Sequence, residues 1–320
     1  MVNGQIWRQY AGDNSAKGNA MGSMRISYLH KGMGLALLAL CLCAPAMAQQ
    51  RSFDDVEIKT TKLADGYYEL EGAGGNIGLS VGEDGVFMVD DQFGPLAPKI
   101  RAAIKEITDQ PVRFIVNTHY HPDHTGGNTA WAGMGAVIIS HDNLRQRLEA
   151  QTTGDKPALG AAALPAITIS DKATFHWNGE TISLHHIPHA HTDGDLVVRF
   201  HNADVIQTGD IWRTVSYPRI DVNGGGSMKG LIAALDTLAA MGGPETRYVP
   251  GHGVVSSRAD IIAVRDMMKT IWSRVADAKA AGKSLDETKA AAPTAEFDGK
   301  WATEALPGSL IVEQIYAELP

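Results

Sequence analysis

The densest group of side chains able to do chemistry lies at residues 117–128, where the sequence is NTHYHPDHTGGN. His119, His121, Asp123 and His124 place three imidazoles and one carboxylate within six residues. Neutral imidazole nitrogens and carboxylate oxygens are the ligands that Zn²⁺ accepts where no thiolate is at hand. Ligand-type residues at this density predict a metal site rather than a histidine-rich surface turn.

A strand followed by a turn can position these ligands. Residues 113–116 are mostly apolar and β-branched or aromatic, which predicts a buried strand. Alternate residues of an extended chain point the same way, so His119 and His121 can share one ion. The proline that follows turns the chain, so Asp123 and His124 can face a neighbouring ion. The local geometry therefore favours two metals over one.

This H-x-H-x-D-H string resembles that of the metallo-β-lactamase superfamily of dinuclear metallohydrolases. The family has three further ligands in order along the chain, and the sequence offers His191 in PHAHTDGDLVV, Asp210 in VIQTGDIWR and His252 in YVPGHG. The resemblance spans residues 57–270. It implies a first metal held by His119, His121 and His191, a second held by Asp123, His124 and His252, and a bridging Asp210.

One alternative ligand lies in the second of these segments. His189 precedes His191 by two residues and is its rival for the first metal. The residues 192–195 that follow His191 resemble the family string, which favours His191.

The resemblance also implies the fold, an α/β four-layer αβ/βα sandwich in which helices flank two mixed sheets. The expected order of elements agrees with it. Apolar residues at helical spacing predict helices over 97–108, 227–241 and 258–281. Strands are predicted over 66–70, 77–81, 85–90 and 136–140, with a strand-rich run over 166–206. The ligands then fall on loops after strands, where α/β folds place their chemistry.

The first part of the chain has the pattern of a secretory signal. Residues 24–48 contain basic Arg25 and Lys31, a short apolar core and the cleavage string Ala46-Met47-Ala48. The core is too short to span a bilayer comfortably. We therefore expect residues 1–23 to be an unstructured extension or misplaced start, 24–48 a signal peptide, and 49–320 a single domain. This predicts a periplasmic or secreted protein with no stable membrane anchor after cleavage.

Composition limits the partners of the mature chain. The full sequence has 28 basic and 36 acidic residues, of which four and one lie before residue 49, leaving a net charge of −11. No basic run interleaved with aromatics is present, so we expect a small-molecule substrate and no nucleic acid. Both cysteines lie within the signal, so thiolate ligands and disulfides are not expected. The oligomeric state stays open.

The expected chemistry is hydrolysis. Two neighbouring divalent ions lower the pKa of a bridging water toward ~7, which supplies hydroxide without a separate base. We expect two zinc ions per chain. Some β-lactamases of the family have Cys or Ser where this chain has Asp210, whereas glyoxalase II and many lactonases have Asp. The set is then all nitrogen and oxygen, so iron or manganese can compete with zinc.

Several residues near the ligands are candidates for substrate contact. Arg213 lies three residues past Asp210, the offset at which cysteine-ligand β-lactamases place a Lys that binds the substrate carboxylate. The alternative is a solvated loop arginine. Tyr120 and Trp212 flank ligands and are expected to line the site. Asp123 is also the candidate catalytic residue. Asp90, at the end of a strand, is expected to orient a ligand histidine, whereas Asp91 is expected in a turn.

These features support hypotheses of two classes. The first is a secreted metallohydrolase that opens small cyclic amides of the β-lactam kind, with a lactonase or thioesterase as the alternative and an iron persulfide dioxygenase after these. The second is a non-catalytic periplasmic metal-binding protein. The complete ligand set argues against the second class, because a protein without turnover has no need of an open hydrolytic geometry.

Overall fold

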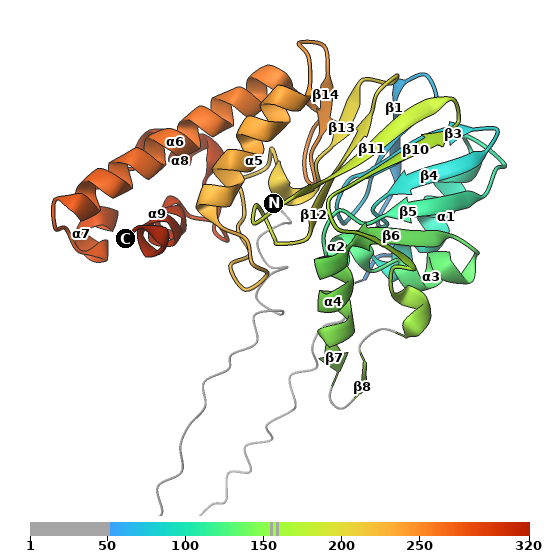
Figure 1. The fold of residues 1–320 in the computed structure, drawn as a ribbon, viewed down its shortest axis with the longest axis horizontal. Coiled ribbons are helices and arrows are strands. Elements are labelled where there is room, and N and C mark those ends of the chain that lie inside the picture. Colours follow the sequence, from blue (N-terminus) through green and yellow to red (C-terminus); the bar gives the residue numbers. More distant parts are fainter. Residues whose placement is uncertain (1–51, 154–155, 158–159) are drawn as a thin grey trace, which may run out of the picture. The chain divides into compact units, whose positions relative to one another are not determined.

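Two mixed β-sheets form the centre of the fold in the computed structural model, which describes residues 52–153, 156–157 and 160–320 (Figure 1). The first sheet has the order β1 (Lys59–Ala64), β2 (Tyr67–Glu71), β3 (Ile77–Gly82), β4 (Gly85–Val89), β5 (Val112–Val116), β6 (Val137–His141) and β9 (Ile167–Ile169). The second has the order β10 (Lys172–Trp177), β11 (Glu180–Ile187), β12 (Asp195–Phe200), β13 (Val205–Gln207), β14 (Arg247–Val249) and β15 (Ser256–Ser257). Each sheet combines antiparallel and parallel pairs, the parallel ones being β4–β5–β6–β9 and β13–β14.

Strand alternation directs side chains to both faces of each sheet. Phe87 and Val89 of β4 share a core between the sheets with Leu196 and Val198 of β12. Their neighbours on β4 point the other way, and Met88 packs in a separate core with helix residues. Both faces of the parallel strands are therefore covered, as their apolar sequence requires.

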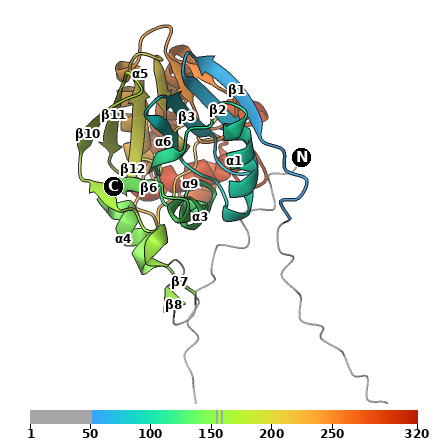
Figure 2. The same cartoon turned by 90° about the vertical axis from the view of Figure 1, so that its right-hand side faces the viewer.

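Helices cover the outer faces of the sheets (Figure 1). The chain contains α1 (Ala97–Lys105), α2 (Pro122–Thr125), α3 (Asn128–Gly133), α4 (Asp142–Ala150), α5 (Met228–Met241), α6 (Arg258–Ala280), α7 (Leu285–Ala290), α8 (Ala295–Trp301) and α9 (Gly308–Glu318). Short 3-10 turns lie at η1 (Gly94–Leu96), η2 (Ala161–Ala163) and η3 (Gly209–Ile211). Figure 2, turned by 90°, shows α4 leading into a small hairpin of β7 (Thr152–Thr153) and β8 (Lys156–Pro157).

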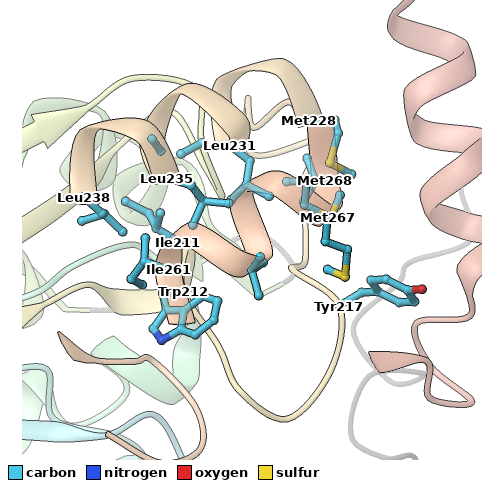
Figure 3. Packing of buried hydrophobic residues seen from close by; sticks show 14 of the residues in the cluster. Ile211, Trp212, Tyr217, Met228, Leu231, Leu235, Leu238, Ile261, Met267 and Met268 are labelled. Atoms are coloured by element: carbon cyan, nitrogen blue, oxygen red, sulfur yellow. The ribbon is translucent and has the colours of Figure 1, made fainter. Parts of the chain in front are cut away.

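The helices on the second sheet bury a large apolar cluster (Figure 3). Leu231, Leu235 and Leu238 of α5 share it with Ile261 and Met268 of α6. Residues at such spacing line one face of a helix, so burying that face supplies most of its stability. The four layers predicted from the sequence are thus confirmed as helices, sheet, sheet and helices.

The predicted elements agree with the structure to within a few residues. The helix predicted over 97–108 ends earlier, at Lys105, where the amides of Ile107 and Thr108 both turn back to the Ile104 carbonyl. The turn expected at Pro122 is the helical turn α2. The three helices after residue 284 had no counterpart in the prediction.

The segment from Phe53 to Pro320 folds as one compact unit. The expected extension, signal peptide and cleavage point, residues 1–48, lie outside the described residues. Among the helices that the structure describes, none has the length and hydropathy needed to cross a membrane.

Candidate metal centre

Seven potential ligands from four segments meet at one end of the sheets. They form three overlapping groups in which the donor atoms lie within 4.8 Å of one another. The groups are His119, His121 and His191; His119, His124 and Asp210; and Asp123, His124 and His252. These are the seven residues expected from the sequence, and the structure brings all of them together.

Local backbone structure separates the two halves of the H-x-H-x-D-H string. His121 is extended, and it immediately precedes α2, in which the His124 and Thr125 amides donate to the His121 carbonyl. Asp123 and His124 therefore project from a helical turn instead of continuing the extended alternation. Close backbone contact is also needed, because a Cβ on Gly75 would lie 2.1 Å from the His124 ring. Only glycine fits at position 75.

The first three histidines present nitrogen atoms to one another. His121 Nδ1 lies 3.0 Å from His191 Nε2, and His119 Nε2 is buried without a hydrogen-bond partner among the described residues. Burial lowers the pKa of His191 to about 3 and that of His119 well below its usual value. Both imidazoles are therefore neutral at physiological pH, the form that binds a metal ion.

Asp210 lies between the two sets of expected ligands. Its Oδ1 is 3.3 Å from His124 Nε2 and 3.2 Å from His252 Nε2, while its Oδ2 is 3.8 Å from His191 Nε2. Asp123 Oδ2 is 3.2 Å from the same His252 nitrogen. One carboxylate oxygen thus faces each set, which is the placement that a bridging ligand requires.

The electrostatics of the second set favour a bound cation. Burial alone would lower the pKa of His124, but the carboxylates of Asp90, Asp123 and Asp210 raise it well above its usual value. Burying several carboxylates together is costly unless positive charge compensates them. The donor atoms, the unpartnered His119 nitrogen and this excess of negative charge all fit divalent metal ions.

Two further aspartates orient the ligand histidines. Asp90 Oδ2 lies 2.7 Å from His124 Nδ1 and accepts from the Thr118 hydroxyl, as expected from the sequence. Asp221 Oδ2 lies 2.9 Å from His121 Nε2 and also accepts from the Tyr120 hydroxyl. Burial alone would raise the pKa of Asp221, but its bonds from His121 and Tyr120 lower it. Such partners fix the ring orientation and strengthen the histidine as a ligand.

The sequence interpretation missed Asp221, because it lies 100 residues from His121 and no local pattern marks it. It also placed Asp91 in a turn. Asp91 is instead fully buried, and its Oδ1 accepts from the Gly127 amide, so it joins the end of β4 to the segment after α2.

Replacing Asp221 with Ala is expected to weaken metal binding by about 10- to 100-fold, the usual cost of losing such a partner. Competition with a chromophoric chelator measures this affinity directly. Tyr120→Phe is the matched control, since it removes one hydrogen bond to Asp221 but leaves the carboxylate beside His121. Unchanged affinity in the Asp221 variant would show that the contact does not position His121.

The residues expected to contact substrate lie in different surroundings in the structure. Tyr120 lies beside His121, with a ring separation of 4.7 Å. Arg213 is buried, and its Nη1 lies 3.9 Å from Asp210 Oδ2, so it is not the solvated loop arginine considered as the alternative. Trp212 requires a correction. It packs in the helix-side core, and its Nε1 donates to Ser256, so it has no exposed surface for a substrate (Figure 3).

His189 does not belong to any of the ligand groups. It is exposed with a positive φ of 53°, and its Nδ1 lies 2.9 Å from the Gly225 carbonyl oxygen. His191 is buried, and its Nδ1 lies 2.7 Å from the Arg219 carbonyl oxygen, which leaves Nε2 for the metal. The geometry thus favours His191 as the ligand.

Comparisons with known proteins agree with this fold and site. The family model described as the metallo-β-lactamase superfamily matches residues 70–263. A hydroxyacylglutathione hydrolase from Pelagibacter ubique is 28% identical over 113 residues, which cover 34% of this chain and 41% of that protein. The chain thus spans about two fifths of the length of this curated relative.

Solved structures share the fold at low sequence identity. A metallo-β-lactamase from Pontibacter korlensis has a TM-score of 0.58 and 16% identity, covering 67% of this chain and 99% of its own. The sec-alkyl sulfatase PisA1, solved as a double mutant, has a TM-score of 0.63 and 15% identity, covering 81% of this chain and 50% of its own.

An αβ/βα sandwich with a cluster of histidines and aspartates at the strand ends defines a metal-binding hydrolase class. The chain belongs to the metallo-β-lactamase superfamily, as its family match over most of both sheets shows.

Proposed function

We propose that this protein is an exported dinuclear zinc hydrolase that opens small cyclic amides or esters carrying a carboxylate, with β-lactam-like amides as the first candidates. The observation that carries the proposal is the position of Asp210 between the two sets of ligands. In this assignment His119, His121 and His191 hold one ion, and Asp123, His124 and His252 hold the other.

When bound, such a pair of ions supplies hydroxide near neutral pH and polarises the scissile carbonyl. The protein's own residues supply position and charge. Asp123, whose Oδ2 lies 3.2 Å from His252 Nε2, is the carboxylate that can take the proton of the attacking hydroxide and pass it to the leaving nitrogen or oxygen as the ring opens. Asp90 and Asp221 hold His124 and His121 in fixed orientations. These residues move a proton or orient ligands, so substrate recognition falls to other residues at the edge of the centre.

Arg213 is the residue that supports an anionic substrate. Its Nε and Nη1 make no hydrogen bond within the described part of the chain, although the side chain is buried. A buried guanidinium is costly without a counter-charge. Asp210 is its nearby acid at 3.9 Å, and bound metal ions would take up that negative charge. A substrate carboxylate would then complete the balance.

Arg213→Ala is expected to raise KM about 10- to 100-fold for carboxylate-bearing substrates, since a charge-assisted pair contributes about 1.5–3 kcal/mol. Neutral lactones should be affected little, because they offer no partner. Arg213→Lys keeps the charge without the planar guanidinium, so its KM for carboxylate-bearing substrates should lie between those of the wild type and Arg213→Ala. Steady-state kinetics on matched acid and neutral substrates measures the effect. Equal losses on both would assign Arg213 a structural role.

A lactone or thioester is the second candidate substrate. The residue type at position 210 favours it, because glyoxalase II and many lactonases have Asp where some β-lactamases have Cys or Ser. The partial match to a hydroxyacylglutathione hydrolase points the same way. A panel of nitrocefin, lactones and thioesters against the zinc-loaded protein distinguishes the candidates. Hydrolysis of none of them would count against the proposed function.

A further inference from the structure

Only some of the candidate ligands of the metal centre have side chains exposed to solvent, and these define its exposed edge. The side chains of His119, His124, His191 and Asp210 are buried almost completely. The His252 side chain is 18% exposed, and the His121 side chain is 10% exposed. The centre is therefore open to solvent mainly at His252, and to a smaller extent at His121 and at Asp123, whose side chain is 8% exposed.

Large apolar side chains are exposed on the segments that carry site residues. In the described part of the chain five large hydrophobic residues are exposed, and three of them lie within two residues of a site residue in the sequence. Val254 lies two residues after His252, Val215 two after Arg213, and Val222 one after Asp221. Scattered exposed apolar residues are ordinary, but two that lie side by side next to a ligand call for an explanation.

Hydrogen bonds hold two of these valines beside His252. Arg213 and His252 form a parallel β-bridge, and the Thr214 amide donates to the His252 carbonyl at 3.0 Å. The Val254 amide donates to the Thr214 hydroxyl at 2.8 Å. Val215 and Val254 are thus carried on two segments that are joined on both sides of the ligand.

Gly253 brings these segments close together. Its φ is +101°, a conformation that other residues rarely adopt, and a Cβ there would lie 2.0 Å from Thr214 Oγ1 and 2.9 Å from Val215 Cγ1. The valines are therefore displayed on a constrained turn, with Val254 69% exposed and Val215 41% exposed.

We infer that Val215 and Val254 form an apolar ledge that binds an apolar substituent of an anionic substrate whose acid group pairs with Arg213. The inference rests on the proposed function for the identity of the reacting group. The bridge places each valine of the ledge two residues after a site residue, Val215 after Arg213 and Val254 after His252, so both ends of such a molecule can be held beside the centre. The substrate class is thus a small amphiphilic acid.

Binding of two thiol acids to the zinc-loaded mature protein tests the ledge. Mercaptoacetate and 2-mercapto-3-phenylpropanoate share the thiol and the acid, but only the second carries an apolar ring. Calorimetry on the wild type should show about tenfold tighter binding of the phenyl compound, from burial of part of its ring. The double variant Val215→Ser, Val254→Ser should reduce this gain to about threefold or less, with mercaptoacetate binding unchanged.

Ile167→Ser is the matched control, since Ile167 is 43% exposed on β9, the edge strand of the first sheet, which carries none of the candidate ligands. It should keep the full gain. No gain in the wild type, or an equal gain in the double variant, overturns the ledge. The substrate panel is scored separately. If the wild type shows the gain and the double variant loses it, but no panel substrate is hydrolysed, the proposed function is rejected and the ledge is kept. If a panel substrate is hydrolysed but the gain is equal in the wild type and the double variant, the ledge is rejected and the proposed function is kept.

Discussion

Asp210→Ala is expected to lower kcat/KM by more than about 100-fold, beyond the usual cost of losing a partner outside the ligand set. The reason is its position, because the two oxygens of this carboxylate face His191 on one side and His124 and His252 on the other. Without it, the centre loses the carboxylate whose oxygens face both sets. Metal content should fall together with activity, as elemental analysis of the purified variant would show.

Two controls separate the role of Asp210 from general damage. Asp210→Asn keeps the size but loses the charge, so it should also lose most activity. His189→Ala should be mild, since His189 is exposed and outside the ligand groups. Melting temperatures should show that all three variants fold. A His189 variant more damaging than the Asp210 variants would reject the ligand assignment in the segment before β12.

Complete removal of metal by a chelator is expected to abolish activity, and two equivalents of zinc per chain should restore it. The same treatment should lower the melting temperature, because a ligand that binds the folded state stabilises it. The physical reason lies in the centre itself. Burial there would raise the pKa of the Asp123 and Asp210 carboxyls, and without a metal ion it falls to the positive charge of His124 and His252 to lower it.

Elemental analysis after gentle purification completes this prediction. We expect about two ions per mature chain from the split of the seven ligands around Asp210. A single ion, or activity that survives complete chelation, would contradict the dinuclear assignment. Reconstitution with iron or manganese in place of zinc would show whether a donor set made only of nitrogen and oxygen atoms discriminates between the three metals.

Local signals in the sequence were enough for most elements of the fold. Ser227 caps α5 through its hydroxyl, and Ser257 forms a capping box with Asp260 at the start of α6. Both helices begin where their apolar periodicity begins, because the cap and the pattern favour the same boundary. A local signal was present for α7 as well, since Ser284 forms a capping box with Glu287 at the start of this short helix. The helix α8 has no side-chain cap, and α9 packs into the core with α5 and α6. Their formation therefore depends on tertiary packing.

The sequence by itself was enough to identify the candidate ligand set, since His119, His121, Asp123 and His124 lie within six residues and the other three candidates follow in a recognisable order. Tertiary structure decided what surrounds them. Trp212 and Arg213 are neighbours in the chain, yet the first packs in the core and the second lies near Asp210. Asp221 meets His121 across 100 residues. Candidate metal ligands can be recognised by residue type and spacing. The orientation and burial of the side chains around them depend on contacts between distant segments, which no local pattern encodes.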